Sequence, residues 1–328
     1  MRYGVPYKGS KNQIAPWVLS VLPSAENFYD VFAGGCAVTH CALTKGKYKH
    51  YYASDIGDAP ALFYSAVSGL YASEDRWISR EDFAQLKDSD PYVRYCWSFG
   101  NNGRDYLYAK EVEPWKKALH YARVHKDLTL FREYGINTDG TRADIIRHEK
   151  EYKKKYIIWY CRNVLHSSFD ALELQSLERL QRLESLQSLQ NLESLQSLER
   201  LQSLESLQRL ESLQKLQISR LSYDDIKIKS NSVIYCDPPY YNTDGYDEEE
   251  FDHRRFWDWC EKQEEPCFVS EYWMPEDRFE VVASVSKRVL LCLGSDRVKE
   301  EKIFVPKRQI KWVRGMIERK YTQLMFDF

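Results

Sequence analysis

An acidic residue, two prolines and a tyrosine stand together directly after a short apolar segment. Residues 232–236 have the composition of a buried strand, and Asp237, Pro238, Pro239 and Tyr240 follow. Because proline carries no N–H, the polar groups of this turn are mainly carbonyl oxygens and one carboxylate. Such acceptors suit an exocyclic amine on a nucleobase, and Tyr240 offers a ring on which a base can stack. The alternative interpretation is an ordinary turn at the end of a strand.

A second candidate segment joins a predicted strand at 28–32 to a predicted helix. It contains Gly34 and Gly35, and Asp55 follows the next predicted strand at 51–54. In dinucleotide-binding folds a glycine turn and an acidic residue at the neighbouring strand end hold a nucleotide, the acid accepting hydrogen bonds from ribose. Close helix–strand packing at the glycines and a helix N-cap role for Asp55 are the alternatives.

Further motifs occur in a consistent order along the chain. They are Tyr7-Lys8-Gly9-Ser10-Lys11, Asp30-Val31-Phe32-Ala33-Gly34-Gly35-Cys36, Ser54-Asp55-Ile56, Asp237-Pro238-Pro239-Tyr240 and Ser270-Glu271-Tyr272. In this order they resemble the motifs of the Dam-type (D12 class) DNA adenine-N6 methyltransferases. The resemblance covers residues 1–88 and 223–306 well. It covers the middle of the chain poorly, and the leucine-rich stretch not at all.

The resemblance implies an enzyme that takes its methyl group from S-adenosylmethionine. Cofactor-binding roles are implied for Tyr7, Lys11, Phe32, Gly34, Gly35, Asp55, Ile56 and Asp237, with Lys11 meeting the methionine carboxylate. Catalytic roles are implied for Asp237, Pro238 and Tyr240, acting on an adenine that is flipped out of the duplex. The family usually has glycine where this chain has Cys36, and a cysteine there is strained if the position needs a positive φ.

Candidates for contacts with double-stranded DNA lie in the middle of the chain. They are Asn101, Asn102, Arg104, Lys116 and Lys117. Arginine and asparagine can read base edges, and lysine contacts phosphates. A charge run of this kind is equally typical of a solvated helix face.

Composition excludes several other classes of protein. The net charge of −2 over 328 residues provides no global basic field, so DNA affinity must come from a local patch. The eight cysteines form no C-x-x-C pair, which argues against a structural metal site and suits a reducing compartment. There is no apolar signal segment and no run long enough for a membrane span. We therefore expect no bound metal, no membrane partner and a cytoplasmic, intracellular location.

Alternating strand and helix signals predict an α/β fold with a parallel sheet. The resemblance implies that this is a Rossmann-like S-adenosylmethionine-dependent methyltransferase sheet assembled from both ends of the chain. Further strand signals occur at 267–270, 289–293 and 302–305. The expected divisions are a cofactor-binding half (1–88), a mainly helical target-recognition region (89–171), a Leu-x-x repeat insertion (172–218) and a catalytic half (219–328).

Leucine occupies every third position from Leu174 to Leu216. The intervening residues favour helix, but three residues advance only about 300° around an α-helix, so the leucines spiral around it instead of forming a seam. We expect a helix that packs on something, with self-association as one outcome; partial disorder is the alternative.

The sequence thus predicts methyl transfer to adenine N6 in DNA. The rival hypotheses are the same chemistry on cytosine N4 or on RNA, and a protein that has lost cofactor binding and acts in DNA binding or assembly.

Overall fold

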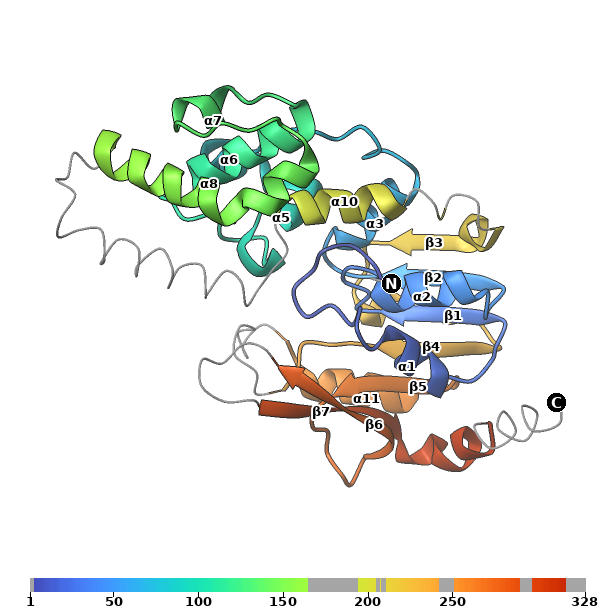
Figure 1. The fold of residues 1–328 in the computed structure, drawn as a ribbon. Coiled ribbons are helices and arrows are strands. Elements are labelled where there is room, and N and C mark those ends of the chain that lie inside the picture. Colours follow the sequence, from blue (N-terminus) through green and yellow to red (C-terminus); the bar gives the residue numbers. More distant parts are fainter. Residues whose placement is uncertain are drawn as a thin grey trace, which may run out of the picture. The chain divides into compact units, whose positions relative to one another are not determined.

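The computed structural model describes residues 3–164, 194–204, 207, 211–241, 251–289 and 297–316. The chain forms two compact units: residues 1–72 with 199–328, and residues 73–198. The first unit therefore contains both ends of the chain, and the second is inserted between them in sequence. Figure 1 shows the sheet of the first unit and the helices of the second.

The first unit is built on one seven-stranded sheet with the order β3-β2-β1-β4-β5-β7-β6. In chain order the strands are β1 (Asn27–Val31), β2 (His50–Ser54), β3 (Leu216–Ser219), β4 (Ser232–Cys236), β5 (Cys267–Glu271), β6 (Phe279–Val289) and β7 (Arg297–Pro306). Strands β1 to β5 pair in parallel, whereas β7 is antiparallel to both β5 and β6. The sheet is thus mixed and mostly parallel, as an α/β methyltransferase fold requires.

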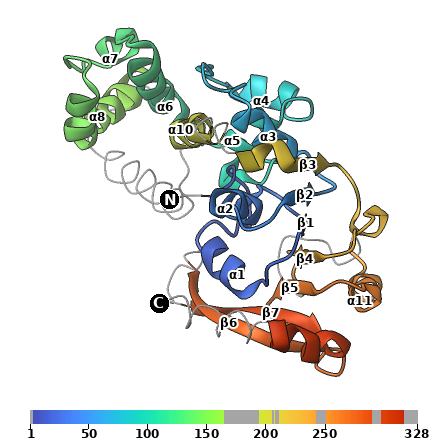
Figure 2. The same ribbon diagram turned by 90° about the vertical axis from the view of Figure 1, so that its right-hand side faces the viewer.

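Helices cover both faces of this sheet. Those of the first unit are α1 (Ala15–Val21), α2 (Ala37–Lys45), α3 (Ala59–Val67) and α11 (His253–Lys262), together with the short 3₁₀ helices Glu211–Lys215, Tyr223–Asp225 and Lys307–Gln309. Figure 2 shows α1 and α2 on one face and α11 on the other. Because both faces are covered, the central strands β1 and β4 are buried along their whole length.

Strand β1 shows how the alternation of side chains builds the two faces. Tyr29 and Val31 belong to the core cluster that includes Phe256 and Cys260 of α11. Asp30 points the other way and accepts hydrogen bonds from the backbone N–H and the hydroxyl of Thr39 in α2. The strand therefore ties one helix to each side of the sheet.

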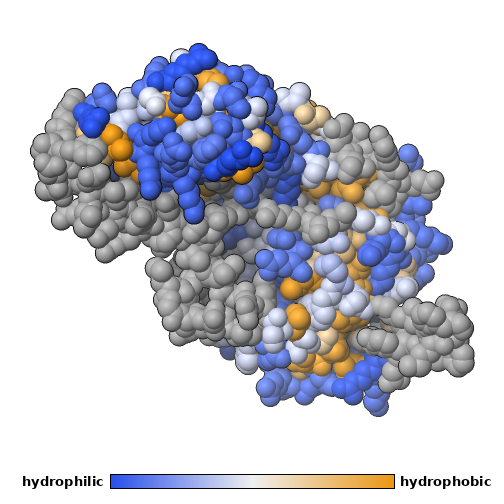
Figure 3. Space-filling model, in the orientation of Figure 1, coloured by the Kyte–Doolittle hydropathy of each residue, from blue (hydrophilic) through white to orange (hydrophobic). Residues whose placement is uncertain are grey.

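The described part of the second unit is helical. Its helices are α4 (Arg80–Leu86), α5 (Pro91–Cys96), α6 (Glu113–His120), α7 (Thr129–Glu133) and α8 (Arg142–Asn163), with a 3₁₀ turn at Phe99–Asn101 and a π-helical turn at Tyr121–His125. Ser79, Asp90 and Thr141 cap the N-termini of α4, α5 and α8 with their side chains. On the face drawn in Figure 3, the surface over α6 to α8 is mostly hydrophilic.

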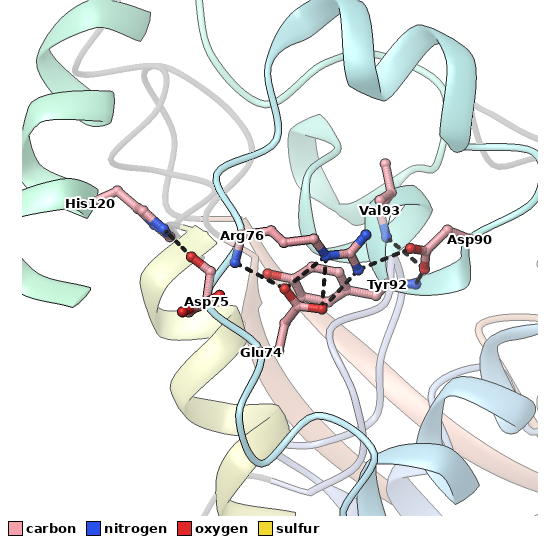
Figure 4. Close-up of polar contacts among 7 residues, drawn as sticks. All are labelled: Glu74, Asp75, Arg76, Asp90, Tyr92, Val93 and His120. Carbon is pink, nitrogen blue, oxygen red and sulfur yellow. Dashed lines mark hydrogen bonds and ion pairs between the residues drawn. The ribbon is translucent and has the colours of Figure 1, made fainter. Parts of the chain in front are cut away.

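An ion-pair network organises the start of the second unit (Figure 4). The guanidinium of Arg76 binds both carboxylate oxygens of Glu74 and lies 3.1 Å from Asp90. Asp90 in turn accepts hydrogen bonds from the first backbone N–H groups of α5. Nearby, Nε2 of His120 lies 2.8 Å from the carbonyl oxygen of Asp75. These contacts hold the segment before α4 against α5 and α6.

The leucine repeat is described only at its C-terminal end. The segment Ser194–Leu204 forms helix α10, in which Leu201 and Leu204 are fully buried. Arg200 is buried too, and it donates hydrogen bonds to the carbonyl oxygens of Tyr3 and Gly4. Residues 174–193 of the repeat lie outside the described part of the chain. So do positions 290–293 of the strand signal at 289–293.

Candidate active site

The carboxyl ends of the five parallel strands meet at one edge of the sheet. Val31, the last residue of β1, pairs with Ser54 of β2 and with Cys236 of β4. The strand order reverses at β1, since β2 lies on one side of it and β4 on the other. Open α/β sheets bind ligands outside the carboxyl ends of the strands at such a reversal. The glycine turn, Asp55 and Asp237 therefore share one ligand-binding edge.

The turn after β1 contains three residues with positive φ. They are Phe32 (64°), Gly34 (46°) and Cys36 (57°). Backbone strain of this kind in residues other than glycine clusters at functional sites. Cys36 therefore has the left-handed backbone conformation that strains a residue other than glycine, and its side chain is completely buried.

Tyr7 packs directly on the glycine turn. A Cβ atom on Gly34 would lie 2.6 Å from the Tyr7 ring, and one on Gly35 would lie 2.8 Å from the Tyr7 Cβ. The neighbouring backbone adds a hydrogen bond of 2.8 Å from Val5 N–H to the Gly35 carbonyl. Only glycine allows the N-terminal segment to approach the turn so closely.

Asp55 follows β2 and contacts the same turn. Its carboxylate accepts hydrogen bonds from the backbone N–H of Gly34 at 2.9 Å and of Gly57 at 2.8 Å. Burial raises the pKa of Asp55, although these two N–H groups oppose the shift. Since a carboxylate can accept about four hydrogen bonds, capacity remains for two hydroxyl groups. The next residue, Ile56, is 71% exposed and places an apolar surface beside this carboxylate.

Asp237 follows β4 and forms an ion pair with Lys11. The Lys11 ammonium lies 2.6 Å from Oδ1 and 2.8 Å from Oδ2 of Asp237. Burial lowers the pKa of Lys11, but the attraction of Asp237 and Glu301 outweighs it, so this pKa is raised and the side chain stays an ammonium. Burial raises the pKa of Asp237, and Lys11 only partly offsets this. Oδ1 is buried and accepts no well-aligned hydrogen bond from the described residues.

Tyr240 lies beside this pair, held on several sides. The Lys11 ammonium is 4.7 Å from its ring centroid, and the Tyr272 ring meets it edge-on at 4.7 Å. Its hydroxyl donates a hydrogen bond to Glu301 of β7. Burial, reinforced by Asp237, raises the pKa of Tyr240 well above its usual range, so the phenol remains a donor.

Glu271, the last residue of β5, fastens the segment after Tyr240. Its carboxyl group accepts hydrogen bonds from the backbone N–H of Tyr241 at 3.0 Å and of Tyr272 at 2.7 Å. Burial raises the pKa of Glu271 to about 8. Tyr241 N–H is the second backbone donor after the two prolines, so Glu271 fixes the point at which the turn leaves the site.

The structure brings the sequence-predicted residues of the first unit to one edge. Phe32 is the exception in orientation, because its ring packs against Tyr223, Phe251 and Phe256 on the α11 side. Sequence reasoning missed Glu301 and Asp30, and gave Glu271 no role. Glu271 stood in a quoted motif at a strand end, which is a usable signal. Glu301 sits in a run of charged residues that reads as solvated surface.

The candidates for DNA contact all belong to the second unit. Asn101 is buried, and its amide donates to the Tyr95 carbonyl at 2.7 Å. Asn102 accepts hydrogen bonds from the backbone N–H of Arg104 and Asp105, which closes a local turn. The side chains of Arg104 and Lys117 are exposed and that of Lys116 is half-buried. Both asparagines thus have structural roles in this loop, and Arg104 projects from it.

Metal-binding clusters and membrane-spanning helices are both absent from the described part of the chain. No group of three or more histidine, cysteine or acidic side chains there is arranged to hold a metal ion. None of the helices described there combines the length and apolarity needed to cross a membrane.

The fold and this edge define an α/β protein with a mostly parallel sheet and an acceptor-rich turn after β4. The model of the D12 class N6 adenine-specific DNA methyltransferases matches residues 7–181, just over half of the chain. A comparison with curated proteins found no match. The matched segment contains Tyr7, Lys11, the glycine turn and Asp55, and ends before Asp237. The chain belongs to the D12 class family, and is an enzyme that methylates adenine in DNA.

Proposed function

We propose that this protein transfers a methyl group from S-adenosylmethionine to N6 of an adenine flipped out of double-stranded DNA. S-adenosylmethionine supplies an electrophilic methyl group on a sulfonium. The residues at the sheet edge fit such a ligand: Asp55 has acceptor capacity for two ribose hydroxyls, and Ile56 offers an exposed apolar surface beside it. Gly34, Gly35 and the packed Tyr7 form the backbone wall of the site.

The turn after β4 acts on the amine. The N6 lone pair is delocalised into the purine ring, which makes it a poor nucleophile. Asp237 and the Pro238 carbonyl accept the two N6 hydrogens, so that the lone pair is localised toward the methyl donor. The gain comes from positioning and from electrostatic stabilisation of the charge that develops on the amine. The Lys11 ammonium lowers the pKa of Asp237 and so opposes the effect of burial, and its charge suits a cofactor carboxylate at the same edge.

One observation carries the proposal. Asp237 is a mostly buried carboxylate at the carboxyl end of β4, and the Lys11 ammonium holds it at this edge of the sheet. One ammonium occupies only part of the about four acceptor sites of a carboxylate, which leaves capacity for an amine hydrogen. Tyr240, three residues on, adds the stacking ring that an extruded base needs.

The second unit is proposed to recognise the target sequence, within residues 89–171. Arg104, Lys116 and Lys117 are its candidate contacts to bases and phosphates, with Asn101 and Asn102 shaping the loop that presents Arg104.

The test combines sequencing of modified bases in DNA from expressing cells with titration of S-adenosylmethionine against purified protein. We expect N6-methyladenine at a defined sequence, its loss in Asp237→Ala, and loss of cofactor binding in Asp55→Ala. Asp58→Ala is the matched control, because Asp58 stands three residues away at the start of α3 with no side-chain capping bond. Methyladenine that persists in Asp237→Ala refutes the proposal. Modified cytosine, or DNA binding without cofactor binding, supports the rival hypotheses instead.

A further inference from the structure

Glu301 is a buried acid that no motif of the sequence singles out. It lies on β7, which pairs with β5 on one side and with β6 on the other, opposite Val285. Only 1% of its surface is exposed, whereas the preceding residue, Glu300, is exposed because successive side chains of a strand point to opposite faces. Burying an acid in a strand is costly unless its oxygens have partners.

Its partners are two residues of the active site. One carboxyl oxygen accepts the hydrogen bond from the Tyr240 hydroxyl, and the same oxygen lies 3.8 Å from the Lys11 ammonium. Lys11 in turn contacts Asp237 at 2.6 Å and lies over the Tyr240 ring. Glu301 therefore connects the ring that would stack on the base with the cation that contacts the amine acceptor.

We propose that Glu301 is a positioning residue for methyl transfer, an inference that rests on the proposed function. Its hydrogen bond fixes the tilt of the Tyr240 ring, together with the Lys11 ammonium over the ring and the edge contact of Tyr272. Its negative charge also attracts the Lys11 ammonium, which weakens the interaction between this ammonium and Asp237. Without it Lys11 binds Asp237 alone and competes with the N6 hydrogens for the same oxygens. Glu301 thus acts through Tyr240 and Lys11 and touches no substrate itself.

Four variants test this arrangement. Glu301→Gln keeps an oxygen for the Tyr240 hydroxyl but loses the charge that strengthens this hydrogen bond and attracts Lys11. Tyr240→Phe leaves the carboxyl group in place and removes only the hydrogen bond. Their double variant tests whether the two residues act as a unit. Glu300→Gln makes the same chemical change one residue away on the exposed face, and is the matched control.

The measurements are kcat and KM for DNA carrying the methylated sequence, and the fluorescence of 2-aminopurine placed at the target adenine. We expect Glu301→Gln to lower kcat by about tenfold to a hundredfold, the effect of one hydrogen-bonded charged group. KM for DNA should change by less than about threefold, since Glu301 touches no DNA. The 2-aminopurine signal should change in both single variants, because it reports how the flipped base stacks. In the double variant the effects on kcat should not multiply.

Two results overturn the inference while wild-type protein is active. One is a Glu301→Gln enzyme that matches Glu300→Gln in kcat and in 2-aminopurine fluorescence. The other is multiplication of the two single effects, which would show that Glu301 and Tyr240 act independently. If Glu301→Gln does not fold, as judged by circular dichroism, Tyr240→Phe alone decides: unchanged kcat and fluorescence refute the role of the hydrogen bond. Wild-type protein that methylates no adenine refutes the proposed function itself, and this inference with it.

Discussion

Replacing Cys36 tests whether the strained turn after β1 is tolerated or harmful. Cys36 has φ 57° and ψ 35°, a left-handed conformation that costs an L-residue about 1–2 kcal/mol. Glycine avoids this cost but loses about 0.4–1 kcal/mol through the greater freedom of the unfolded chain. The buried methyl group of alanine contributes about 0.8 kcal/mol, so Cys36→Gly and Cys36→Ala should be equally stable to within about 1 kcal/mol. Comparing these two variants cancels the loss of the sulfur atom, which both share.

The assay is urea unfolding of both variants, followed by circular dichroism. Ala42, fully buried in the middle of α2, supplies the control, because an Ala42→Gly change at an ordinary helical φ should destabilise by about 1 kcal/mol or more. Glycine in place of alanine should therefore cost about 1–2 kcal/mol less at position 36 than at position 42, where no left-handed strain is relieved. An equal cost of glycine at the two positions would refute the assignment of strain.

The same variant addresses cofactor binding. Because Cys36 already adopts the conformation that glycine would, Cys36→Gly should leave the Kd for S-adenosylmethionine unchanged within about threefold, less than 1 kcal/mol. An affinity that improves tenfold or more would instead show that the cysteine impairs the site, as the rival hypothesis of a protein without cofactor binding requires.

Four further predictions concern charge and the loop that contains Arg104. Lys11→Met removes the group that lowers the pKa of Asp237, so the acid limb of the kcat/KM profile should move to higher pH by about one unit or more. Lys11→Arg keeps the positive charge and should move the limb less. An unshifted acid limb in Lys11→Met refutes the role of the ion pair. Burial raises the pKa of Asp30 to about 7, so the folded state holds a proton that the unfolded state releases. Asp30 should therefore make wild-type stability fall by up to about 1.4 kcal/mol per pH unit as pH rises from about 4 to 7, and Asp30→Asn should reduce the measured slope by that amount in urea titrations. Asn101→Ala should destabilise by about 1–2 kcal/mol, through loss of the bond to Tyr95 and an alanine at positive φ. Arg104→Ala should leave the urea midpoint unchanged and weaken DNA binding in a salt-dependent way, whereas unaltered DNA affinity would exclude Arg104 as a contact.

Much of the fold was predictable because local signals and burial agree in the central strands. The apolar segment at 232–236 coincides with β4, and the segment at 267–270 with β5 but for one residue. Strand β3 was not predicted, because its residues continue the leucine repeat and only pairing with β2 makes them a strand. Strand β6 was missed over most of its length, since it is an edge strand with polar residues on one face and a bulge near Val281.

The same division holds for the site. The types and order of Tyr7, Lys11, Gly34, Asp55 and Asp237 are local properties, and they were enough to indicate a nucleotide site and a family. That Lys11 pairs with Asp237, 226 positions away, depends on the sheet order and could not be read from either segment. The same is true of Glu301, whose alternation with Glu300 indicates two faces but not which one meets Tyr240. Sequence by itself determined which chemical groups are available at the strand ends. Only the tertiary structure decided which of these groups form ion pairs and hydrogen bonds with one another, because those contacts join distant segments that burial and strand pairing bring together.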